Sequence, residues 1–459
     1  MARLRRERPD GLRLPCRRAT VARVPRSGAQ DLRSRRVVND VWDELQWRGL
    51  VAHSTDEAAL QEALQTGPLT YYVGFDPTAA SLHVGHLVQV LTAKRLQQAG
   101  HRPLILVGGA TGLVGDPRPS AERTMNDPSV VAGWVTGLQG QIAPFLDFDG
   151  PAAATMVNNL DWTQSMSTIE FLRDVGKHFS VNRMLDREAV SKRLATTGIS
   201  FTEFSYVLLQ SNDYLQLHRR HGCTLQLGGS DQWGNITAGC ELVRRVDQRT
   251  VHALATPLLT KADGTKFGKT ESGAVWLDPE LTSPYAFHQF WLNAEDAKVV
   301  DYLKAFSFRP REEIEELGRQ AVENPRARAA QRALAHEVTA LVHGEEAAVA
   351  VEAAAAALFG GSDLEAIDER ILRGALAELP TAAPADRDVR LAQLFADTGL
   401  APSLSGARRT IGEGGAYVNN IKLTDPEATL RDVQLLHGRY AVLRRGKKSL
   451  ASVAVPLPQ

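Results

Sequence analysis

The chain has 459 residues, 43% of them hydrophobic and 23% charged, and its 53 basic residues balance 53 acidic ones. This is ordinary globular composition and enough chain for two to four domains. The three cysteines (Cys16, Cys223, Cys240) show no CxxC spacing, which argues against a zinc ribbon or a disulfide scaffold. No run of about 18 apolar residues indicates a membrane span, so we expect a cytoplasmic protein without a membrane anchor.

Residues 1–38 do not resemble folded structure. They hold twelve arginines, no lysine and three acids, and they lack the apolar core of a secretory signal. A nucleic-acid-binding arm and an organellar leader are the alternatives. We favour a later translation start, because a valine, which a GTG start codon can encode, stands directly before Asn39. Without this extension the chain would carry 41 basic and 50 acidic residues, a net charge of about −9.

Residues 40–66 predict amphipathic helices, and Leu69–Phe75 predicts a buried strand. The turn Asp76-Pro77-Thr78 follows, and then a helix that ends at Gly100. Its first turn carries His83 and His86 on one face, with Gly85 between them.

Because the first backbone N–H groups of a helix lack internal partners, this turn is suited to a polyphosphate. Gly85 leaves room for a base or a ribose. Capping or core histidines are the alternative.

Arg102–Val107 predicts a second buried strand, and the segment from Gly108 to Asp116 that follows has GxxGxxG spacing. This is not the dinucleotide motif GxGxxG. Asp116 is expected at the carboxyl end of the strand, where ligands of α/β sheets bind, with a solvated turn aspartate as the alternative. A strand at Thr155–Asn158 and helices from Thr168 to Leu194 continue the alternation, which predicts a parallel sheet with right-handed crossovers.

Ser200–Tyr214 predicts a strong helix on which Tyr206, Gln210 and Asp213 share one face. The helix is apolar on most other sides, so this polar stripe needs partners and could form a binding wall. Leu225–Asn235 predicts a strand, a glycine turn and a new helix. Asp231 at this turn either caps the helix or holds a ribose hydroxyl.

Lys261–Thr270 is a glycine-containing loop with Lys266 and Lys269 three residues apart. Two ammonium groups on such a loop can follow a triphosphate as its charge moves to a leaving pyrophosphate. A solvated basic loop is the alternative.

The rest of the chain divides by composition. Pro284 to about Gly360 predicts only helices, Pro380–Pro384 a linker, and Val389–Val455 a compact basic unit with paired arginines typical of RNA binding. We expect these domains: 39–283, a Rossmann-like parallel-sheet catalytic domain; 284–378, an α-helical domain; 379–388, a linker; and 389–459, a small α+β domain.

Two of these motifs together resemble the signatures of class I aminoacyl-tRNA synthetases: His83-Val84-Gly85-His86 and Lys266-Phe267-Gly268-Lys269-Thr270. Four further blocks make the chain similar to the bacterial tyrosyl-tRNA synthetases from about Asn39 onward: Tyr72–Thr78, Gly108–Asp116, Phe201–Asp213 and Gly228–Asn235. The C-terminal unit resembles a small RNA-binding domain of a ribosomal protein. The helical domain would then bind the tRNA anticodon.

The resemblance implies a role for each motif residue. Tyr72 and Asp213 would hold the substrate phenol, and Tyr206, Gln210 and Asp116 its ammonium group, with Gln232 on the amino-acid side. Asp231 would meet the ribose, and Gly74, Asp76, Thr78, His83, Gly85 and His86 the nucleotide and its phosphates. Lys266, Lys269 and Thr270 would bind the triphosphate. Two departures concern nucleotide affinity: a shortened loop after Asp116, where Arg118 could replace a missing lysine, and Gln89 in place of a smaller residue.

The resemblance also implies the reaction. L-tyrosine and ATP would give tyrosyl-adenylate and pyrophosphate, and the tyrosyl group would pass to the terminal ribose of tRNA(Tyr). Mg²⁺ would accompany the nucleotide, without a metal bound by the protein, and the chain would form a homodimer. A tryptophanyl-tRNA synthetase is the nearest alternative, and a non-catalytic RNA-binding protein on the same scaffold is a second.

Overall fold

The computed structural model describes residues 41–117, 126–270, 273–360, 363–446 and 449–456, without the side chains of residues 188, 189, 269, 270 and 360. The Arg-rich segment 1–38 lies outside these ranges. The chain divides into Met1–Asn39 and one compact unit, Asp40–Gln459. Among the described helices, none is long and apolar enough to cross a membrane.

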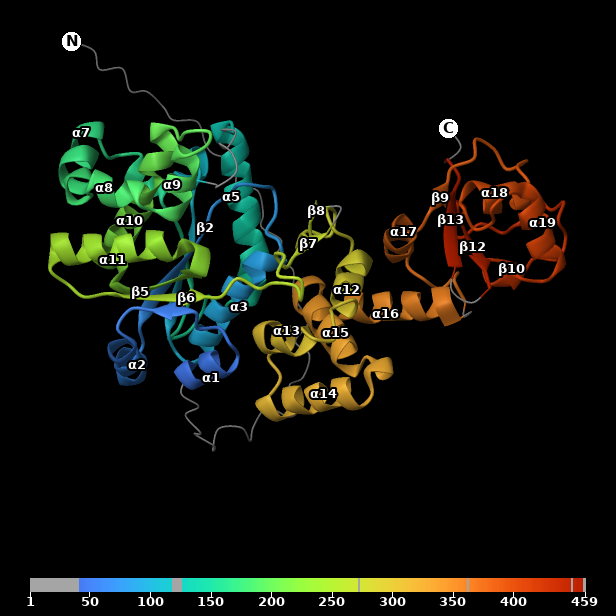
Figure 1. Ribbon diagram of the computed structural model, residues 1–459, viewed down its shortest axis with the longest axis horizontal. Helices are drawn as coiled ribbons and strands as arrows, with labels where there is room; N and C mark the ends of the chain where they lie inside the picture. The colour runs from blue at the N-terminus through green and yellow to red at the C-terminus, as the bar shows by residue number, and fades with distance from the viewer. Residues whose placement is uncertain (1–40, 118–125, 271–272, 361–362, 447–448, 457–459) are drawn as a thin grey trace, which may run out of the picture. The chain divides into compact units, whose positions relative to one another are not determined.

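A six-stranded sheet forms the centre of the first part of the chain (Figure 1). Its strands are β1 (His53–Ser54), β2 (Thr70–Phe75), β3 (Arg102–Val107), β4 (Thr155–Asn158), β5 (Cys223–Gly229) and β6 (His252–Thr256), in the order β1-β6-β5-β2-β3-β4. Every pairing is parallel except that of β1 with β6. The predicted parallel sheet is therefore confirmed. The two-residue strand β1 was not predicted, because it is too short to show a periodic pattern and lies between helices.

Helices cover both faces of the sheet, as the alternation along β2 requires. Tyr71, Val73 and Phe75 share a core with α1 (Val41–Trp47), α3 (Val84–Gln98) and α5 (Pro128–Ile142). Tyr72 lies on the opposite face with α10 (Phe201–His221) and α11 (Trp233–Asp247). The remaining helices of this part are α2 (Glu57–Thr66), α4 (Thr111–Val114), α6 (Leu160–Thr163), α7 (Thr168–Glu170), α8 (Val181–Leu185) and α9 (Glu188–Leu194).

The ends of α3 and α10 follow from local sequence. His83 caps α3, and Gly100 follows its last turn with a φ of +100°, as the sequence predicted. Ser200 caps α10 by accepting a hydrogen bond from the backbone N–H of Glu203. This helix continues beyond the predicted Tyr214 to His221, where Gly222 adopts the left-handed conformation and ends it.

The segment 284–377 forms helices, as predicted from the sequence. They are α12 (Pro284–Leu292), α13 (Val299–Phe306), α14 (Arg311–Glu323), α15 (Ala329–His343), α16 (Glu345–Gly360) and α17 (Glu369–Ala377). Ser283 caps α12 and Pro284 occupies its first turn. The buried side chains of α12, α13 and α15 belong to the same core as α3, so the helical part packs directly on the histidine-bearing helix.

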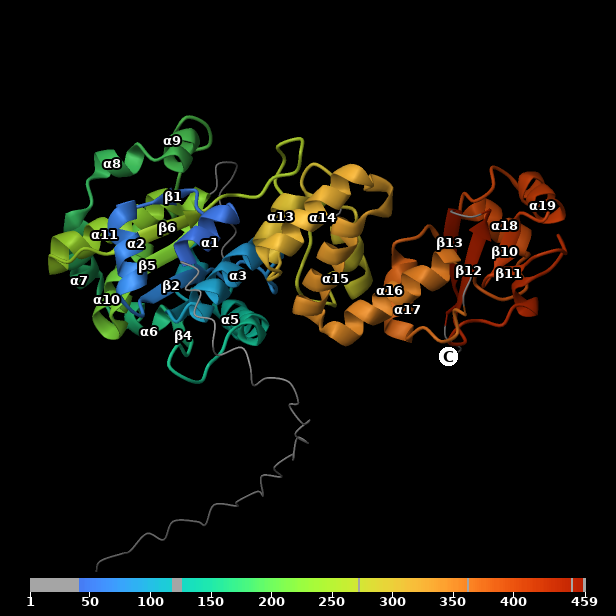
Figure 2. The ribbon, with the colours of Figure 1, turned by 90° about the horizontal axis from the view of Figure 1, so that it is seen from below.

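A second sheet, in the order β11-β10-β12-β13-β9, forms the C-terminal part (Figure 2). Its strands are β9 (Thr381–Ala382), β10 (Ala416–Val418), β11 (Ile421–Lys422), β12 (Tyr440–Arg445) and β13 (Ser449–Ala454). The helices α18 (Leu391–Asp397) and α19 (Leu404–Gly412) share a core with one face of this sheet, and α17 packs on the other. The predicted α+β unit is confirmed.

The sheet extends into the range predicted as a linker. Thr381 and Ala382 pair with β13, and the Thr381 and Ser452 hydroxyls lie 2.6 Å apart. A strand of two residues among prolines gives no sequence signal.

Candidate active site

The polar side chains of the candidate site follow the carboxyl ends of the parallel strands. The two strands that follow β2 in the sequence, β3 and β4, lie on one side of it in the sheet, whereas β5 and β6 lie on its other side. The strand order therefore reverses between β2 and β5. Ligands of open α/β sheets bind at such a reversal. Asp76 follows β2, Asn159 follows β4 and Asp231 follows β5. The topology thus gathers side chains from separate parts of the sequence.

His83 and His86 form the N-terminal cap of α3. His83 Nδ1 accepts a hydrogen bond from the backbone N–H of Gly85 (3.1 Å), and His86 Nδ1 accepts one from the backbone N–H of His83 (3.2 Å). The two rings stack with their centroids 3.8 Å apart. Since Nδ1 is the acceptor in both rings, each neutral imidazole carries its hydrogen on Nε2.

This cap changes the predicted anion site. The sequence predicted open backbone N–H groups, but those of His83, Val84 and Gly85 donate to His86, Val275 and His83. Burial, and secondarily the neighbouring His83, lowers the pKa of His86 to about 3, so its ring is neutral at physiological pH. The hydrogen-bond donors of the two rings at this turn are therefore neutral imidazole Nε2–H groups.

The lysine-bearing loop Lys261–Thr270, here called the signature loop, contacts α3. A Cβ built on Gly268 would lie 2.6 Å from Val84 Cγ2, and Gly268 has a φ of +83°. Beyond the loop, the backbone N–H of Val84 donates to the Val275 carbonyl (3.0 Å). The fold thus brings the two signature motifs together. Lys266 is exposed, whereas Lys269 and Thr270 form strand β7 (Lys269–Thr270) with side chains outside the described residues.

Tyr72 and Asp213 form a buried pair on the α10 face of the sheet. Both are 2% exposed, and the Tyr72 hydroxyl has no hydrogen-bond partner. Asp213 accepts hydrogen bonds from Trp162 Nε1 (2.8 Å) and Asn159 Nδ2 (3.0 Å). Burial raises the pKa of Asp213 to about 7 although these two donors lower it. Burial and the nearby Asp213 also raise the pKa of Tyr72.

A chain of hydrogen bonds joins Asp213 to Asp76. Asn159 Nδ2 also donates to Thr111 Oγ1 (2.9 Å), and the Thr111 hydroxyl donates to Asp76 Oδ1 (2.6 Å). The Tyr206 hydroxyl donates to the other oxygen, Asp76 Oδ2, at 2.6 Å. On the same face of α10 as Tyr206, the Gln210 Oε1 atom is buried without a partner.

The hydrogen bonds that join Asp213 to Asp76 leave no room for a side chain at Gly108. A Cβ on Gly108 would lie 2.1 Å from Thr111 Oγ1 and 2.4 Å from Asp76 Oδ1. The glycine-rich segment after β3 therefore lets the backbone approach the polar side chains.

Asp116 does not stand at the carboxyl end of β3, so that prediction was wrong. The short helix α4 comes between them. Asp116 is held instead from the start of α11 and the residue before it, because Gln232 Nε2 donates to its Oδ2 (2.9 Å) and Asn235 Nδ2 to its Oδ1 (3.1 Å). Arg187 Nη1 in turn donates to Asn235 Oδ1 (2.5 Å).

The other predicted residues lie at the same edge. Gly74 is exposed near the end of β2, and Thr78 is half-buried, with its backbone N–H bonded to the Asp76 carbonyl (2.8 Å). Asp231 is exposed in a short 3₁₀ turn (Ser230–Gln232) between β5 and α11. A Cβ on Gly229 would lie 2.6 Å from Asp231 Oδ1, so glycine leaves room for that carboxylate.

Sequence reasoning missed four residues of the hydrogen-bond network: Thr111, Asn159, Trp162 and Asn235. Asn159 directly follows a correctly predicted strand, so the rule applied to Asp116 could have identified it. Trp162 and Asn235 carry no sequence signal of their own.

Of the two departures from the family pattern noted in the sequence, only Gln89 lies among the residues that the structure describes. Gln89 Nε2 donates to Thr256 Oγ1 (2.5 Å) at the end of β6, while Arg118 lies outside the described residues. Among the residues that the structure describes, no three His, Cys, Asp or Glu side chains are grouped as a metal site.

Two family profiles match the chain. The profile described as tRNA synthetases class I (W and Y) matches residues 64–360, and the Tyrosine--tRNA ligase SYY-like C-terminal domain matches residues 371–453. The match to the first spans strands β2 to β6, both signature motifs and helices α12 to α16.

Curated relatives extend over nearly the whole chain. A tyrosine--tRNA ligase of Streptomyces griseus is 64% identical over 420 residues, which cover 91% of this chain and 99% of the relative. One of Thermobifida fusca is 58% identical, with the same shares covered. The structure of a C-terminally truncated mitochondrial tyrosyl-tRNA synthetase of Aspergillus nidulans, at 31% identity, superposes with a TM-score of 0.63 and covers 70% of this chain and 94% of that one. The chain therefore belongs to the tyrosine--tRNA ligase family of class I tRNA synthetases.

Proposed function

We propose that the site described above makes tyrosyl-adenylate from L-tyrosine and ATP, before the tyrosyl group passes to the 3′-terminal ribose of tRNA(Tyr). Family membership gives the reaction class, and the residue roles are our proposal. The observation that carries them is a pair of buried atoms without a partner, the Tyr72 hydroxyl and Gln210 Oε1. Leaving such an atom unsatisfied costs about 1–3 kcal/mol, so a polar ligand group bound beside each of them would be stabilised. Tyrosine supplies both, a phenol hydroxyl and an ammonium group.

The phenol hydroxyl binds between Tyr72 and Asp213. Asp213 is already oriented by Trp162 and Asn159, so it presents a fixed carboxyl group to the ligand. Phenylalanine lacks the hydroxyl and would leave the Tyr72 hydroxyl buried without a partner. The pocket therefore selects tyrosine by its polar end, and tryptophan would have to place an indole ring against the same buried pair.

The ammonium group binds to Gln210, Tyr206 and Asp116, with Gln232 beside them. Gln210 Oε1 is a free acceptor, and the Tyr206 oxygen can accept while its hydrogen is donated to Asp76. Asp116 adds negative charge and is held in place by Gln232 and Asn235. This arrangement directs the substrate carboxylate toward the carboxyl edge of the sheet.

The nucleotide lies along the strand ends and the first turn of α3. Exposed Gly74 and Gly85 let the base and ribose approach the backbone, and Asp231 accepts a ribose hydroxyl. Asp76 and Thr78 line the same edge. Mg²⁺ arrives with ATP as part of the substrate.

The tyrosine carboxylate attacks the α-phosphorus, a carboxylate–phosphorus bond forms, and the bond to pyrophosphate breaks. No general base is needed because the attacking carboxylate is already ionised. His83 and His86 donate hydrogen bonds from neutral rings, while Lys266, Lys269 and Thr270 balance the charge that moves onto pyrophosphate. Catalysis then rests on positioning and electrostatic stabilisation.

We also propose a homodimer that uses an apolar surface on the catalytic part. Large apolar side chains are exposed along consecutive elements from α7 to the start of α10: Ile169 (70%), Leu172 (49%), Val181 (58%), Leu185 (36%), Leu194 (49%) and Phe201 (74%). Exposed apolar side chains in such a cluster are typical of a protein interface. Light scattering would test this: Phe201→Asp should convert a dimer into a monomer, and a wild-type monomer would contradict the proposal.

The helical residues 284–378 and the C-terminal residues 389–459 are assigned to tRNA binding. In the C-terminal sheet Arg444 stacks over the Tyr417 ring at 4.0 Å, and Arg409 and Arg445 are exposed. An aromatic ring with one stacked guanidinium, in a domain that carries further exposed arginines, suits RNA. We assign the enzyme to the cytoplasm as part of this proposal.

ATP–pyrophosphate exchange with each of the twenty amino acids tests the proposal. Exchange with tyrosine alone is the expected result. Exchange with tryptophan would overturn the pocket assignment, and no exchange from folded protein would favour the non-catalytic RNA-binding function.

A further inference from the structure

The phenylalanine of the signature loop lies in an aromatic socket on the helical part of the chain. The Phe267 ring centroid lies 4.2 Å from that of Tyr302 on α13, and 5.1 and 5.4 Å from those of Phe290 and Trp291 on α12. Phe306 follows at 5.9 Å. Trp291, Tyr302 and Phe306 are almost completely buried, so the socket is a fixed part of the core.

Two further bonds attach the loop to α13 and to the connection between α12 and α13. The Tyr302 hydroxyl donates to the Thr260 carbonyl (3.0 Å) just before the loop, and Glu295 accepts from the backbone N–H of Ala262 (2.6 Å). Phe267 is only half-buried and borders a groove of about 1220 Å³ between the loop, α12 and α17. The loop therefore has open space on one side, and its contacts with α12 and α13 decide where it rests.

The residue after Phe267 contacts the other signature motif. Gly268 lies against Val84 and Gly85 at the start of α3, and its carbonyl accepts a hydrogen bond from the backbone N–H of Val275 (3.1 Å). Two adjacent residues of the signature loop thus make different contacts: Phe267 packs in the aromatic socket, and Gly268 packs on the histidine-bearing helix α3.

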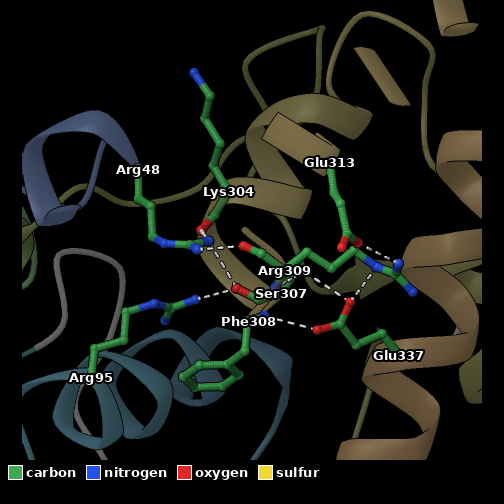
Figure 3. A network of polar contacts seen from close by, with 8 residues as sticks. All are labelled: Arg48, Arg95, Lys304, Ser307, Phe308, Arg309, Glu313 and Glu337. Atoms are coloured by element: carbon green, nitrogen blue, oxygen red, sulfur yellow. Dashed lines mark hydrogen bonds and ion pairs between the residues drawn. The ribbon is translucent and has the colours of Figure 1, made fainter. Parts of the chain in front are cut away.

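The far end of α13 is itself fixed to α3 (Figure 3). The Ser307 carbonyl accepts hydrogen bonds from Arg95 Nη2 on α3 (2.7 Å) and from Arg48 Nη1 (2.8 Å). The Arg95 guanidinium also lies over the Phe308 ring at 4.5 Å. Glu337 on α15 holds the same turn by accepting from the Ser307 hydroxyl (2.8 Å). Helix α13 is therefore attached to α3 at one end and to the signature loop at Tyr302.

We propose that Phe267 is a positioning residue, and that α13 and its aromatic socket fix the signature loop relative to His83 and His86. This inference rests on the proposed function. The distance that the Phe267 anchor sets is the one between Lys266 on the loop and the phosphate donors His83 and His86 on α3. A loop without the Phe267 anchor would sample the adjacent groove, and Lys266 would spend less time beside the phosphates. Only the step in which pyrophosphate leaves uses that contact.

The test compares Phe267→Ala with Phe267→Leu and with Phe148→Ala, the removal of a 39% exposed phenylalanine away from the socket. Single-turnover adenylate formation should fall about 10- to 100-fold in Phe267→Ala, since a small displacement of an aligned group costs that much. Phe267→Leu should lose less, because leucine fills part of the socket, and Phe148→Ala should behave as wild type.

The tyrosine KM and the rate of transfer from preformed adenylate should not change in Phe267→Ala, because neither involves the triphosphate. A general loss of folding would lower both steps together, and this result would overturn the proposal. A wild-type rate of adenylate formation in Phe267→Ala would overturn it as well.

Limited trypsin digestion of the full chain, mapped by mass spectrometry, adds a readout that needs no activity. Cleavage after Lys261 and Lys266 should be faster in Phe267→Ala than in Phe148→Ala and wild type. If the wild-type chain formed no adenylate, the proposed function would fail, but this comparison would still decide whether Phe267 anchors the loop. Unchanged cleavage would show that it does not.

Discussion

Asn159 donates a hydrogen bond to the buried carboxyl group of Asp213 at 3.0 Å, and the same amide bonds to Thr111. A carboxyl group that receives its donors from the protein is held in one orientation before the substrate arrives. The Asp213 side chain then contributes a fixed acceptor near Tyr72, whose hydroxyl has no hydrogen-bond partner. Selection of tyrosine over phenylalanine should depend on this preorganisation.

Asp213→Ala should weaken tyrosine activation and reduce Tyr/Phe discrimination. Loss of the carboxyl group removes a polar partner that only tyrosine uses. The ratio of activation with tyrosine to activation with phenylalanine should therefore fall at least about tenfold. Pyrophosphate exchange with both amino acids measures it. Asp231→Ala is the control, because that exposed carboxylate is assigned to the ribose and should affect both amino acids equally. An unchanged ratio in Asp213→Ala would refute the assigned role.

Asp213 should also make the stability of the free enzyme depend on pH. Its pKa is raised from 3.8 to about 7, so on raising the pH the unfolded chain loses this proton before the folded chain does. Its contribution to stability is complete below pH 3.8 and is lost as the pH rises through 7. Compared with Asp213→Asn, in which this position does not titrate, the free energy of unfolding of the wild type should fall by about 3 kcal/mol between pH 5 and pH 8. Urea unfolding at both pH values measures this, and any constant cost of the substitution cancels.

The elements that carry the site could be predicted from sequence because their signals are local. An apolar run of strand length gave β2, β3 and β4, and helical spacing with Gly100 gave α3. Tyr206, Gln210 and Asp213 recur along one helix, so their common face followed from the period alone.

What the sequence could not show depends on contacts between distant segments. Nothing near Asp116 predicts that Gln232 and Asn235 would hold it, since they come from another strand–helix unit. The histidines show the same limit. Their spacing predicted a phosphate-binding turn, but only the structure shows that Nδ1 of each ring caps the helix and that burial keeps His86 neutral.

His83→Asn should separate the capping role of this residue from its role toward phosphate. Asparagine is a good N-cap, so its side-chain oxygen can still accept from the Gly85 N–H, but it cannot supply the more distant Nε2–H. We expect a fall in kcat for activation of about 10- to 100-fold, as for removal of a transition-state donor, with an unchanged tyrosine KM. A lower melting temperature together with a raised tyrosine KM would show instead that the residue is mainly structural.

Gly268→Ala should disturb the contact between the two signature motifs. The new methyl group would stand 2.6 Å from Val84 Cγ2, on a backbone with a φ of +83°. Gly264→Ala is a matched control in the same loop, since its φ is +80° and nothing lies within 4 Å of the added carbon. Both variants bear the strain of a positive φ, so their difference reports the contact with α3. Adenylate formation should be at least about tenfold slower in Gly268→Ala than in Gly264→Ala, and equal rates would show that the contact is unimportant.

Arg48→Met should destabilise the junction between the catalytic and helical parts. Arg48 is 5% exposed and donates to the carbonyls of Lys304 (2.9 Å), Ser307 (2.8 Å) and Arg309 (2.9 Å). Methionine keeps the apolar stem but leaves carbonyl oxygens buried without these donors, so we expect a loss of about 2–4 kcal/mol in the free energy of unfolding. Arg95 still donates to Ser307 in the variant, which limits the loss at that carbonyl.

Arg319→Met is the control for this substitution. Arg319 carries the same group on α14, but its side chain is 71% exposed and its partner Glu316 is on the same helix surface. An exposed i,i+3 pair contributes little because water and salt screen it. Denaturant unfolding of both variants should therefore show a large loss for Arg48→Met only. Equal, small losses would mean that water replaces the Arg48 guanidinium without cost and that the junction does not depend on it.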